Sequence, residues 1–224
     1  MTPSTRLRQP RKDAQLNRAH ILDVAGHAFV NDGVDVSMDA IAKQAGVGNA
    51  TLYRHFPTKD ALLVALLTPH HEQLEQEKAA IEQGGGHAGL MLEQWIDALG
   101  DWMLAYDGLP EPLRAAWSVT GSPLKSTCDG LIESTAVFLR AAQCGGFARP
   151  SLSAQDIFLG ALAVAWASRR STARPDTRTG LRDVLRNGWS AGKDGTDEQA
   201  GGVSGTSNMN RTGARRTRSN SSDR

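Results

Sequence analysis

Residues 36–67 read Val-Ser-Met-Asp-Ala-Ile-Ala-Lys-Gln-Ala-Gly-Val-Gly-Asn-Ala-Thr-Leu-Tyr-Arg-His-Phe-Pro-Thr-Lys-Asp-Ala-Leu-Leu-Val-Ala-Leu-Leu, and this stretch decides the fold. Ser37 is a favourable N-cap, and apolar side chains recur behind it at helical spacing, which predicts a short helix over residues 38–44. Gly46 then ends that helix, because glycine adopts a positive φ without steric cost. A second helix is predicted to begin at Gly48 or Asn49.

The two predicted helices have the features of a helix-turn-helix pair. Ala42 lies where the helices cross and only a small side chain fits, while Val47 and Leu52 close the apolar wedge between them. A pair joined by a short turn that contains glycine is the arrangement that places a second helix in the major groove of DNA. The outward face of this helix is polar and carries no acid: Asn49, Thr51, Tyr53, Arg54 and His55. The alternative is an ordinary helical hairpin with a polar face.

The run 45–62, Ala-Gly-Val-Gly-Asn-Ala-Thr-Leu-Tyr-Arg-His-Phe-Pro-Thr-Lys-Asp-Ala-Leu, is similar to the signature of the TetR (tetracycline-repressor type) family of bacterial transcription regulators. Residues 21–25 with Phe29 and Gly33 resemble that family's first helix. The resemblance is specific over 14–74 and beyond that covers a general helical layout. It implies an all-α protein, with a three-helix DNA-binding domain at 14–74 (helix-turn-helix about 37–56) and a helical effector-binding and dimerisation domain at 75–190.

This interpretation predicts how individual residues of the helix-turn-helix contact double-stranded DNA. Asn49 and Ala50 are expected to touch base edges, and Gly48 to let the backbone approach closely. Phosphate contacts are expected from Thr51, Tyr53, His55 and Lys59, with a further one from Ser37. Arg54 contacts bases or phosphates, or points away. A homodimer would place two such helices on a palindromic operator.

Charge and hydropathy bound the remaining classes of function. The 224-residue chain has a formal net charge of +1, which argues against a protein that coats nucleic acid through bulk charge. Residues 1–13 form a basic arm (Arg6, Arg8, Arg11 and Lys12) that either follows DNA or is a solvated, flexible terminus. The longest apolar run, 158–167, is too short to cross a bilayer, so we expect a cytoplasmic protein without a membrane partner. The Gly-, Ser- and Arg-rich segment 191–224 is expected to be disordered.

The chain between the DNA-binding domain and this tail is predicted to be helical. Helices are expected over 59–81, 88–106, 113–119, 123–144, 154–170 and 177–190, with a glycine break at 83–86 and a turn at 108–112. Cys128 and Cys144 lie in these helices without the spacing of a redox or zinc motif, so both are expected to be free, buried thiols.

Aromatic and apolar residues of this half could line a pocket for a small hydrophobic effector. The candidates are Met91, Trp95, Leu99, Trp102, Tyr106, Trp117 and Phe138, with Asp97 and Asp101 as polar contacts or as part of a wet face. The alternative is plain core packing. The resemblance implies that effector binding changes the spacing of the two DNA-reading helices. No cofactor or metal is expected.

The helix at 154–170 is apolar nearly all round in its middle, so it needs cover on every side. With the last helix it is expected to form a four-helix interface across a two-fold axis, as the resemblance also implies. The expected interface residues are Phe158, Leu162, Trp166, Leu181, Leu185 and Trp189.

The sequence disfavours two other classes of function, a metalloenzyme and a nonspecific DNA binder. His70-His71-Glu72 and His87 suggest a metalloenzyme, but adjacent histidines point to different sides of a helix, whereas helical zinc sites prefer i, i+4 spacing. A nonspecific, nucleoid-type DNA binder is disfavoured by the near-neutral charge. The sequence therefore favours a homodimeric repressor that a small molecule releases from a palindromic operator, and not an enzyme.

Overall fold

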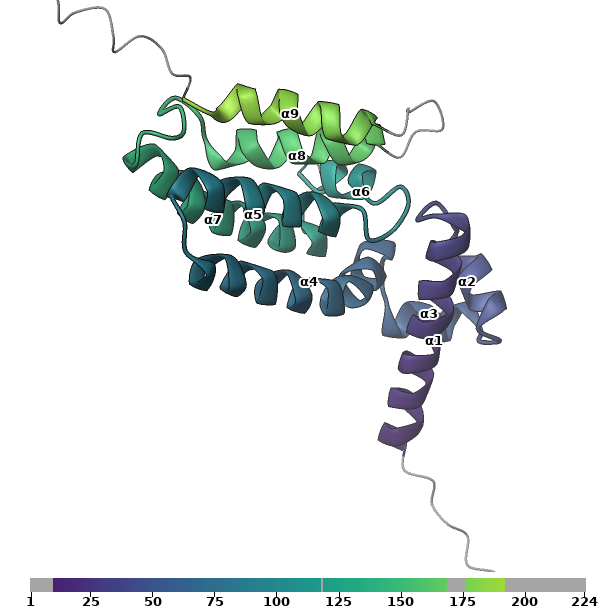
Figure 1. Cartoon of the computed structure of the whole chain (residues 1–224). Coiled ribbons are helices and arrows are strands. Elements are labelled where there is room, and N and C mark those ends of the chain that lie inside the picture. The colour runs from purple at the N-terminus through teal and green to yellow at the C-terminus, as the bar shows by residue number, and fades with distance from the viewer. Residues whose placement is uncertain (1–9, 118, 169–175, 192–224) are drawn as a thin grey trace, which may run out of the picture. The chain divides into compact units, whose positions relative to one another are not determined.

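The computed structural model describes residues 10–117, 119–168 and 176–191, which form nine α-helices (Figure 1). They are α1 (Pro10–Asp32), α2 (Met38–Gln44), α3 (Asn49–His55), α4 (Lys59–Gly84), α5 (Ala88–Met103), α6 (Pro110–Ala115), α7 (Pro123–Cys144), α8 (Ala154–Ser168) and α9 (Thr177–Trp189). The prediction of an all-α protein is confirmed. The disordered tail predicted over 191–224 lies outside the described residues except for Ala191, and the first nine residues of the basic arm lie outside them too.

Helix α1 begins earlier than the sequence suggested. Residues 10–13 were expected to belong to a flexible arm, but they form the first turn of α1. Proline is tolerated there because the first turn of a helix needs no amide donor, and the carboxylate of Asp13 faces the positive end of the helix dipole.

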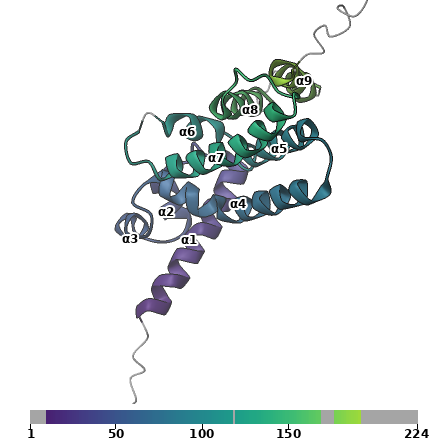
Figure 2. The same ribbon diagram turned by 90° about the vertical axis from the view of Figure 1, so that its left-hand side faces the viewer.

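Helices α1, α2 and α3 lie together in Figure 2, and their buried apolar side chains belong to one cluster. Ile21, Ala25 and Phe29 of α1 are fully buried and contact the same cluster as Ile41 of α2 and Leu52 of α3. Packing against these side chains of α1 holds the two seven-residue helices, which would be marginal in isolation.

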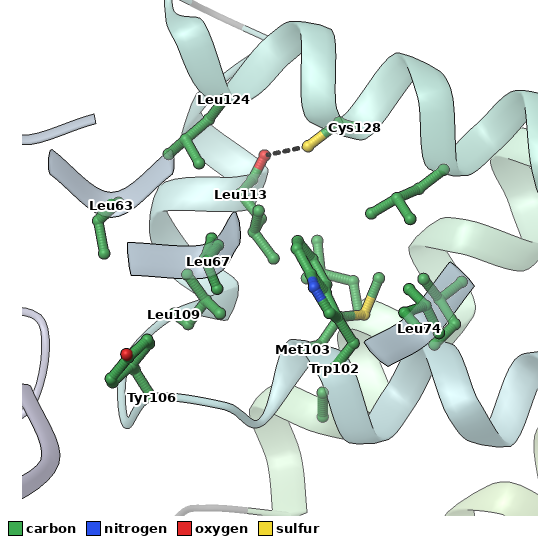
Figure 3. Packing of buried hydrophobic residues seen from close by; sticks show 14 of the residues in the cluster. Leu63, Leu67, Leu74, Trp102, Met103, Tyr106, Leu109, Leu113, Leu124 and Cys128 are labelled. Carbon is green, nitrogen blue, oxygen red and sulfur yellow. Dashed lines mark hydrogen bonds between the residues drawn. The ribbon is translucent and has the colours of Figure 1, made fainter. Parts of the chain in front are cut away.

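Helix α4 connects helices α1, α2 and α3 to the second half of the chain. The Thr58 side chain accepts a 3.1 Å hydrogen bond from the Ala61 amide and so caps this helix. The helix continues through Pro69 and ends three residues later than predicted, at Gly84, before Gly85 with φ 72°. Its buried side chains, among them Leu63, Leu67 and Leu74, face the core of the second half (Figure 3).

The core of the second half lies between α4, α5, α7 and α8. Trp95 is fully buried, donates a 2.9 Å hydrogen bond to the Thr135 hydroxyl and stacks on Phe138, with ring centroids 5.3 Å apart. Figure 3 shows the Cys128 thiol directed at the Leu113 carbonyl, 3.9 Å away. The polar atoms of these two buried side chains are therefore satisfied inside the core.

Helix α9 is joined to α5 by a ladder of ion pairs. Three carboxylates of α5 at four-residue spacing pair, in reverse order, with three arginines of α9: Glu93 with Arg186, Asp97 with Arg182 and Asp101 with Arg178. The Glu93–Arg186 pair spans 2.7 Å. Asp97 and Asp101 therefore bind α9. Because both carboxylates are partly exposed, each ion pair contributes little to stability alone, and the three pairs together fix the register of α9 on α5.

The segment between α5 and α7 differs from the prediction. Helix α5 ends at Met103 and not at residue 106, because the Leu104 and Ala105 amides bond carbonyls three residues back and tighten the chain into a turn. Helix α6 begins at Pro110, inside the expected turn, since proline suits the first turn of a helix. None of the helices in the described ranges is both long and apolar enough to cross a membrane.

Candidate nucleic-acid interface

The turn between α2 and α3 has the geometry that the sequence predicts. Gly46 has φ 63°, its amide bonds the Lys43 carbonyl (3.2 Å), and the Val47 amide bonds the Ala42 carbonyl (3.0 Å). These two bonds make a Schellman ending, which satisfies the last carbonyls of α2 and reverses the chain. Ala42, 1% exposed, packs at the crossing as expected.

Helix α1 also holds the turn and the end of α3 through contacts that the sequence did not suggest. The Arg18 guanidinium lies 5.0 Å from the centre of the Phe56 ring, just after α3, and Nε2 of His20 lies 3.2 Å from the Ala45 carbonyl oxygen. Each contact joins residues far apart in the sequence, so no local pattern announces it. The helix-turn-helix is thus fixed on its inner side by both apolar and polar contacts.

The outer side of α3 is polar and largely exposed. Asn49, Ala50 and Arg54 are exposed and Tyr53 is 44% exposed, whereas Thr51 and His55 are half-buried. Nε2 of His55 is buried and has no hydrogen-bond partner among the described residues. Of the predicted DNA-contacting residues of α3, four are therefore exposed, and Thr51 and His55 are partly covered.

Asp39 of α2 lies beside α3, although no pattern in the sequence indicated that it contacts this helix. The Asn49 side-chain amide donates a 2.9 Å hydrogen bond to Oδ1 of Asp39. Both residues are exposed. The face of α3 itself carries no acid, as predicted, but a carboxylate from the preceding helix touches its first residue.

The remaining predicted contacts lie at the ends of helices. The Ser37 hydroxyl accepts a 3.1 Å hydrogen bond from the Ala40 amide and so caps α2. Lys59, at the start of α4, is half-buried. Burial lowers the pKa of its ammonium group, and the nearby carboxylates of Asp35 and Asp60 oppose that shift. Gly48 has φ −70°, and a Cβ added there would meet nothing within 4 Å.

Two family models match most of the chain. Residues 21–66 match "Bacterial regulatory proteins, tetR family", and residues 87–191 match "Transcriptional regulator SbtR-like, C-terminal domain". The chain belongs to the TetR family. Its helix-turn-helix is thus the DNA-binding element of a family of transcription regulators, and neither family model describes an enzyme.

Individual relatives support this placement. An HTH-type transcriptional regulator of Staphylococcus aureus (strain USA300) is 49% identical over 53 residues, which are 23% of this chain and 29% of that protein. The match thus spans less than a third of the curated relatives' length. Among solved structures, Mycobacterium smegmatis AmtR is similar over 83% of this chain and 88% of that one (TM-score 0.54, 22% identity). Bacillus halodurans FadR, a fatty acid degradation regulator, is similar over 77% of this chain and 95% of its own (TM-score 0.56, 17% identity). This similarity shows the shared fold.

The residues expected to line the effector pocket are mostly packed in the core of this TetR-family chain. Trp95, Leu99 and Phe138 are at most 3% exposed, and Tyr106, whose pKa burial raises, is 7% exposed with its ring edge on Phe29. Met91 and Trp117 are half-buried, and Trp117 packs edge-on against Phe158. Trp102 is 5% exposed, and its indole nitrogen has no hydrogen-bond partner among the described residues.

Cavities lie on both sides of α4. One of about 540 Å³ separates α4 from α7 and is lined by Val64, Leu67, Thr68, His71, Glu72, Glu75, Ser126, Thr127 and Gly130. A second, of about 100 Å³, lies between α4 and α5 and includes Trp102. Of the aromatic and apolar residues predicted for the pocket, only Trp102 lines either of these two cavities, and Asp101, a predicted polar contact, lines the smaller one. Both linings include carboxylates beside apolar side chains, Glu72 and Glu75 in the larger cavity and Glu77 in the smaller one.

Half of the residues expected in a dimer interface are buried by their own chain. Phe158, Leu162 and Trp189 are at most 5% exposed, and so are not free to contact a partner. Leu185 is half-buried against Gly160, where an added Cβ would lie 2.5 Å from the leucine side chain, and Leu181 is half-buried too. Of the six, only Trp166 is exposed (46%). Periodicity does not tell which side of an apolar helix its own chain covers.

Other apolar side chains of α8 and α9 face outward. Leu159 of α8 is 39% exposed and Val184 of α9 is 68% exposed. Cys144 is exposed as well, contrary to the expectation that both thiols are buried, because it is the last residue of α7. Across the described part of the chain, no three His, Cys, Asp or Glu side chains come together as metal ligands would.

Proposed function

We propose that this TetR-family protein is a sequence-specific DNA-binding transcription regulator that acts as a homodimeric repressor on a palindromic operator. The observation that carries the proposal is the exposed polar face of α3 on a helix-turn-helix that α1 holds from behind. Asn49 and Ala50 read base edges, and Tyr53, Thr51, His55, Lys59 and Ser37 contact phosphates. Arg54 is exposed and contacts either.

Release by a small effector would act through α4, because the helix that borders both cavities follows α3 after only three residues. The cavity between α4 and α7 has a volume suited to a small molecule. A ligand held between these helices would change their spacing and so move Lys59 and the reading helix. The cavity suits a ligand with polar groups because its lining offers hydrogen-bonding side chains. These are the hydroxyls of Thr68, Ser126 and Thr127 and the imidazole of His71.

The lining of this cavity also bears on the class of effector. Bacillus subtilis FadR has been solved in complex with stearoyl-CoA. Here the lining includes two carboxylates, Glu72 and Glu75, and none of the lining residues is a lysine or arginine. Phosphates need cationic partners, so an acyl-CoA is disfavoured and a neutral or cationic polar molecule is favoured.

Dimerisation would use the side of α8 and α9 that the chain leaves uncovered. Leu159 and Trp166 of α8 and Val184 of α9 are large apolar residues on this side, and burial against a second copy would remove them from water. Two reading helices about one DNA turn apart would then read a palindrome, whereas one alone contacts too few bases for high specificity.

The proposal is tested with substitutions on the face of α3. Tyr53→Phe removes one phosphate hydrogen bond and weakens binding to all duplexes alike, whereas Asn49→Ala changes the ranking among single-base operator variants. Val30→Ala, at a 68% exposed position of α1, serves as the control and leaves both unchanged. An Asn49→Ala protein with an unaltered ranking would show that Asn49 does not read a base.

A further inference from the structure

We propose that Asp39 is a positioning residue for base recognition: its carboxylate fixes the orientation of the Asn49 amide and thereby the base that Asn49 selects. The inference rests on the proposed function, since it assigns a second residue to the recognition of the same base. The observation is the 2.9 Å hydrogen bond from Nδ2 of Asn49 to Oδ1 of Asp39, which joins the first turn of α2 to the first residue of α3.

The chemistry of the pair removes an ambiguity that asparagine alone would have. An asparagine amide can turn over and exchange its oxygen and its NH₂ group with little change in shape. An ionised carboxylate only accepts hydrogen bonds, so it can bind the NH₂ group and not the oxygen. Asp39 therefore selects one of the two orientations of the Asn49 amide.

That orientation decides what DNA would meet. With one N–H bonded to Asp39, Asn49 keeps its Oδ1 acceptor and its second N–H donor, and no other hydrogen bond of this side chain is found among the described residues. An acceptor beside a donor matches the adenine edge in the major groove, where N6 donates and N7 accepts. The pair thus favours adenine over the other bases at one position of each half-site.

The cost of this arrangement is a negative charge close to the DNA surface. Asp39 is exposed, and an unpaired carboxylate near phosphates opposes binding to any sequence. The Asp39 charge would therefore lower nonspecific affinity while its hydrogen bond raises discrimination. Both effects increase the ratio of specific to nonspecific binding.

The test is a double-mutant cycle on the full-length protein. Binding is measured to a DNA operator selected with the wild-type protein and to its single-base variants at every position. We expect Asp39→Ala to reduce discrimination by about tenfold at one position per half-site, the same position affected by Asn49→Ala. The double variant should lose no more discrimination than Asn49→Ala alone, because Asp39 acts through Asn49. Asp35→Ala removes another exposed carboxylate of this domain and should leave the ranking intact.

The outcomes separate the two proposals. If Asn49→Ala alters the ranking and Asp39→Ala does not, the positioning role is wrong while the assignment of Asn49 stands. If Asn49→Ala alters nothing, the proposed reading helix itself is wrong. Asp39→Asn retains hydrogen-bonding atoms without dictating the amide orientation, so it should lose about as much discrimination as Asp39→Ala. Full discrimination in Asp39→Asn would mean that the acceptor-only carboxylate does not set the orientation of the Asn49 amide, which overturns the inference.

Discussion

The Ser122 hydroxyl donates a 2.5 Å hydrogen bond to Oδ2 of Asp60, which joins the N-cap of α7 to the first turn of α4. Ser122 is 7% exposed, and its oxygen also accepts from the Leu124 amide. Asp60 directly follows Lys59, a proposed phosphate contact. The hydrogen bond therefore connects the start of α4 to α7, across the cavity of about 540 Å³ that lies between these two helices.

Ser122→Ala should lower the free energy of unfolding by about 1 to 2 kcal/mol, because it removes both the cap of α7 and the bond to Asp60. Asp60→Ala removes the bond to Ser122 and a half-buried charge beside Lys59 but leaves the α7 cap in place, so it should cost less. Urea unfolding followed by circular dichroism measures both. A larger loss in Asp60→Ala than in Ser122→Ala would contradict this division.

Two glycines of the helix-turn-helix should respond differently to alanine. Gly46→Ala places a side chain at φ 63° and should destabilise the fold by about 1 to 2 kcal/mol. Gly48→Ala meets open space at φ −70°, so it should fold like wild type but bind its operator about tenfold more weakly, a loss of about 1.4 kcal/mol. Full affinity in a folded Gly48→Ala protein would show that the backbone does not approach DNA there.

The two thiols should differ in reactivity. Burial raises the pKa of Cys128 from 9.0 to about 12, so its thiol stays protonated and unreactive near pH 8, while exposed Cys144 reacts. A thiol-specific dye should therefore label one cysteine in native protein and both in urea. By the same shift, the free energy of unfolding should fall between pH 9 and about 12, where the unfolded thiol ionises first. Labelling of both thiols in folded protein would contradict the buried placement.

The sequence predicts local features well where one residue determines them. The N-cap Ser37 and the helix-ending Gly46 lie as expected, because capping and positive φ depend on the chemistry of a few adjacent atoms. The end of α5 and the start of α6 were misplaced. Apolar periodicity continues through this segment, and only tertiary packing decides where the helix stops.

Side-chain partners across helices could not be predicted in the same way. The bond between Asp39 and Asn49 depends on the angle between α2 and α3. The burial of Trp95 and Leu162 depends on which side of α5 or α8 the chain covers. An apolar residue has the same pattern in a core, a ligand pocket or a dimer interface, so the sequence left these alternatives open.

Dimer formation should depend on the exposed side of α8 and α9. Leu159→Arg or Val184→Arg would place an unpaired charge in a desolvated interface, which costs several kcal/mol and shifts the protein to monomer. Val30→Arg is the matched control, since Val30 of α1 is 68% exposed, as is Val184. Light scattering at micromolar concentration decides the result. A monomeric wild-type protein, or a dimer unaffected by both substitutions, would refute this interface.

The central claim is that the protein reads a palindrome, and nuclease footprinting of full-length protein on DNA around its own gene tests it most directly. We predict one short protected segment whose two half-sites are related by two-fold symmetry and lie about 10 base pairs apart, centre to centre. Tyr53→Phe should weaken this protection without moving it. Protection of every sequence alike, or of none at any protein concentration, would contradict the account.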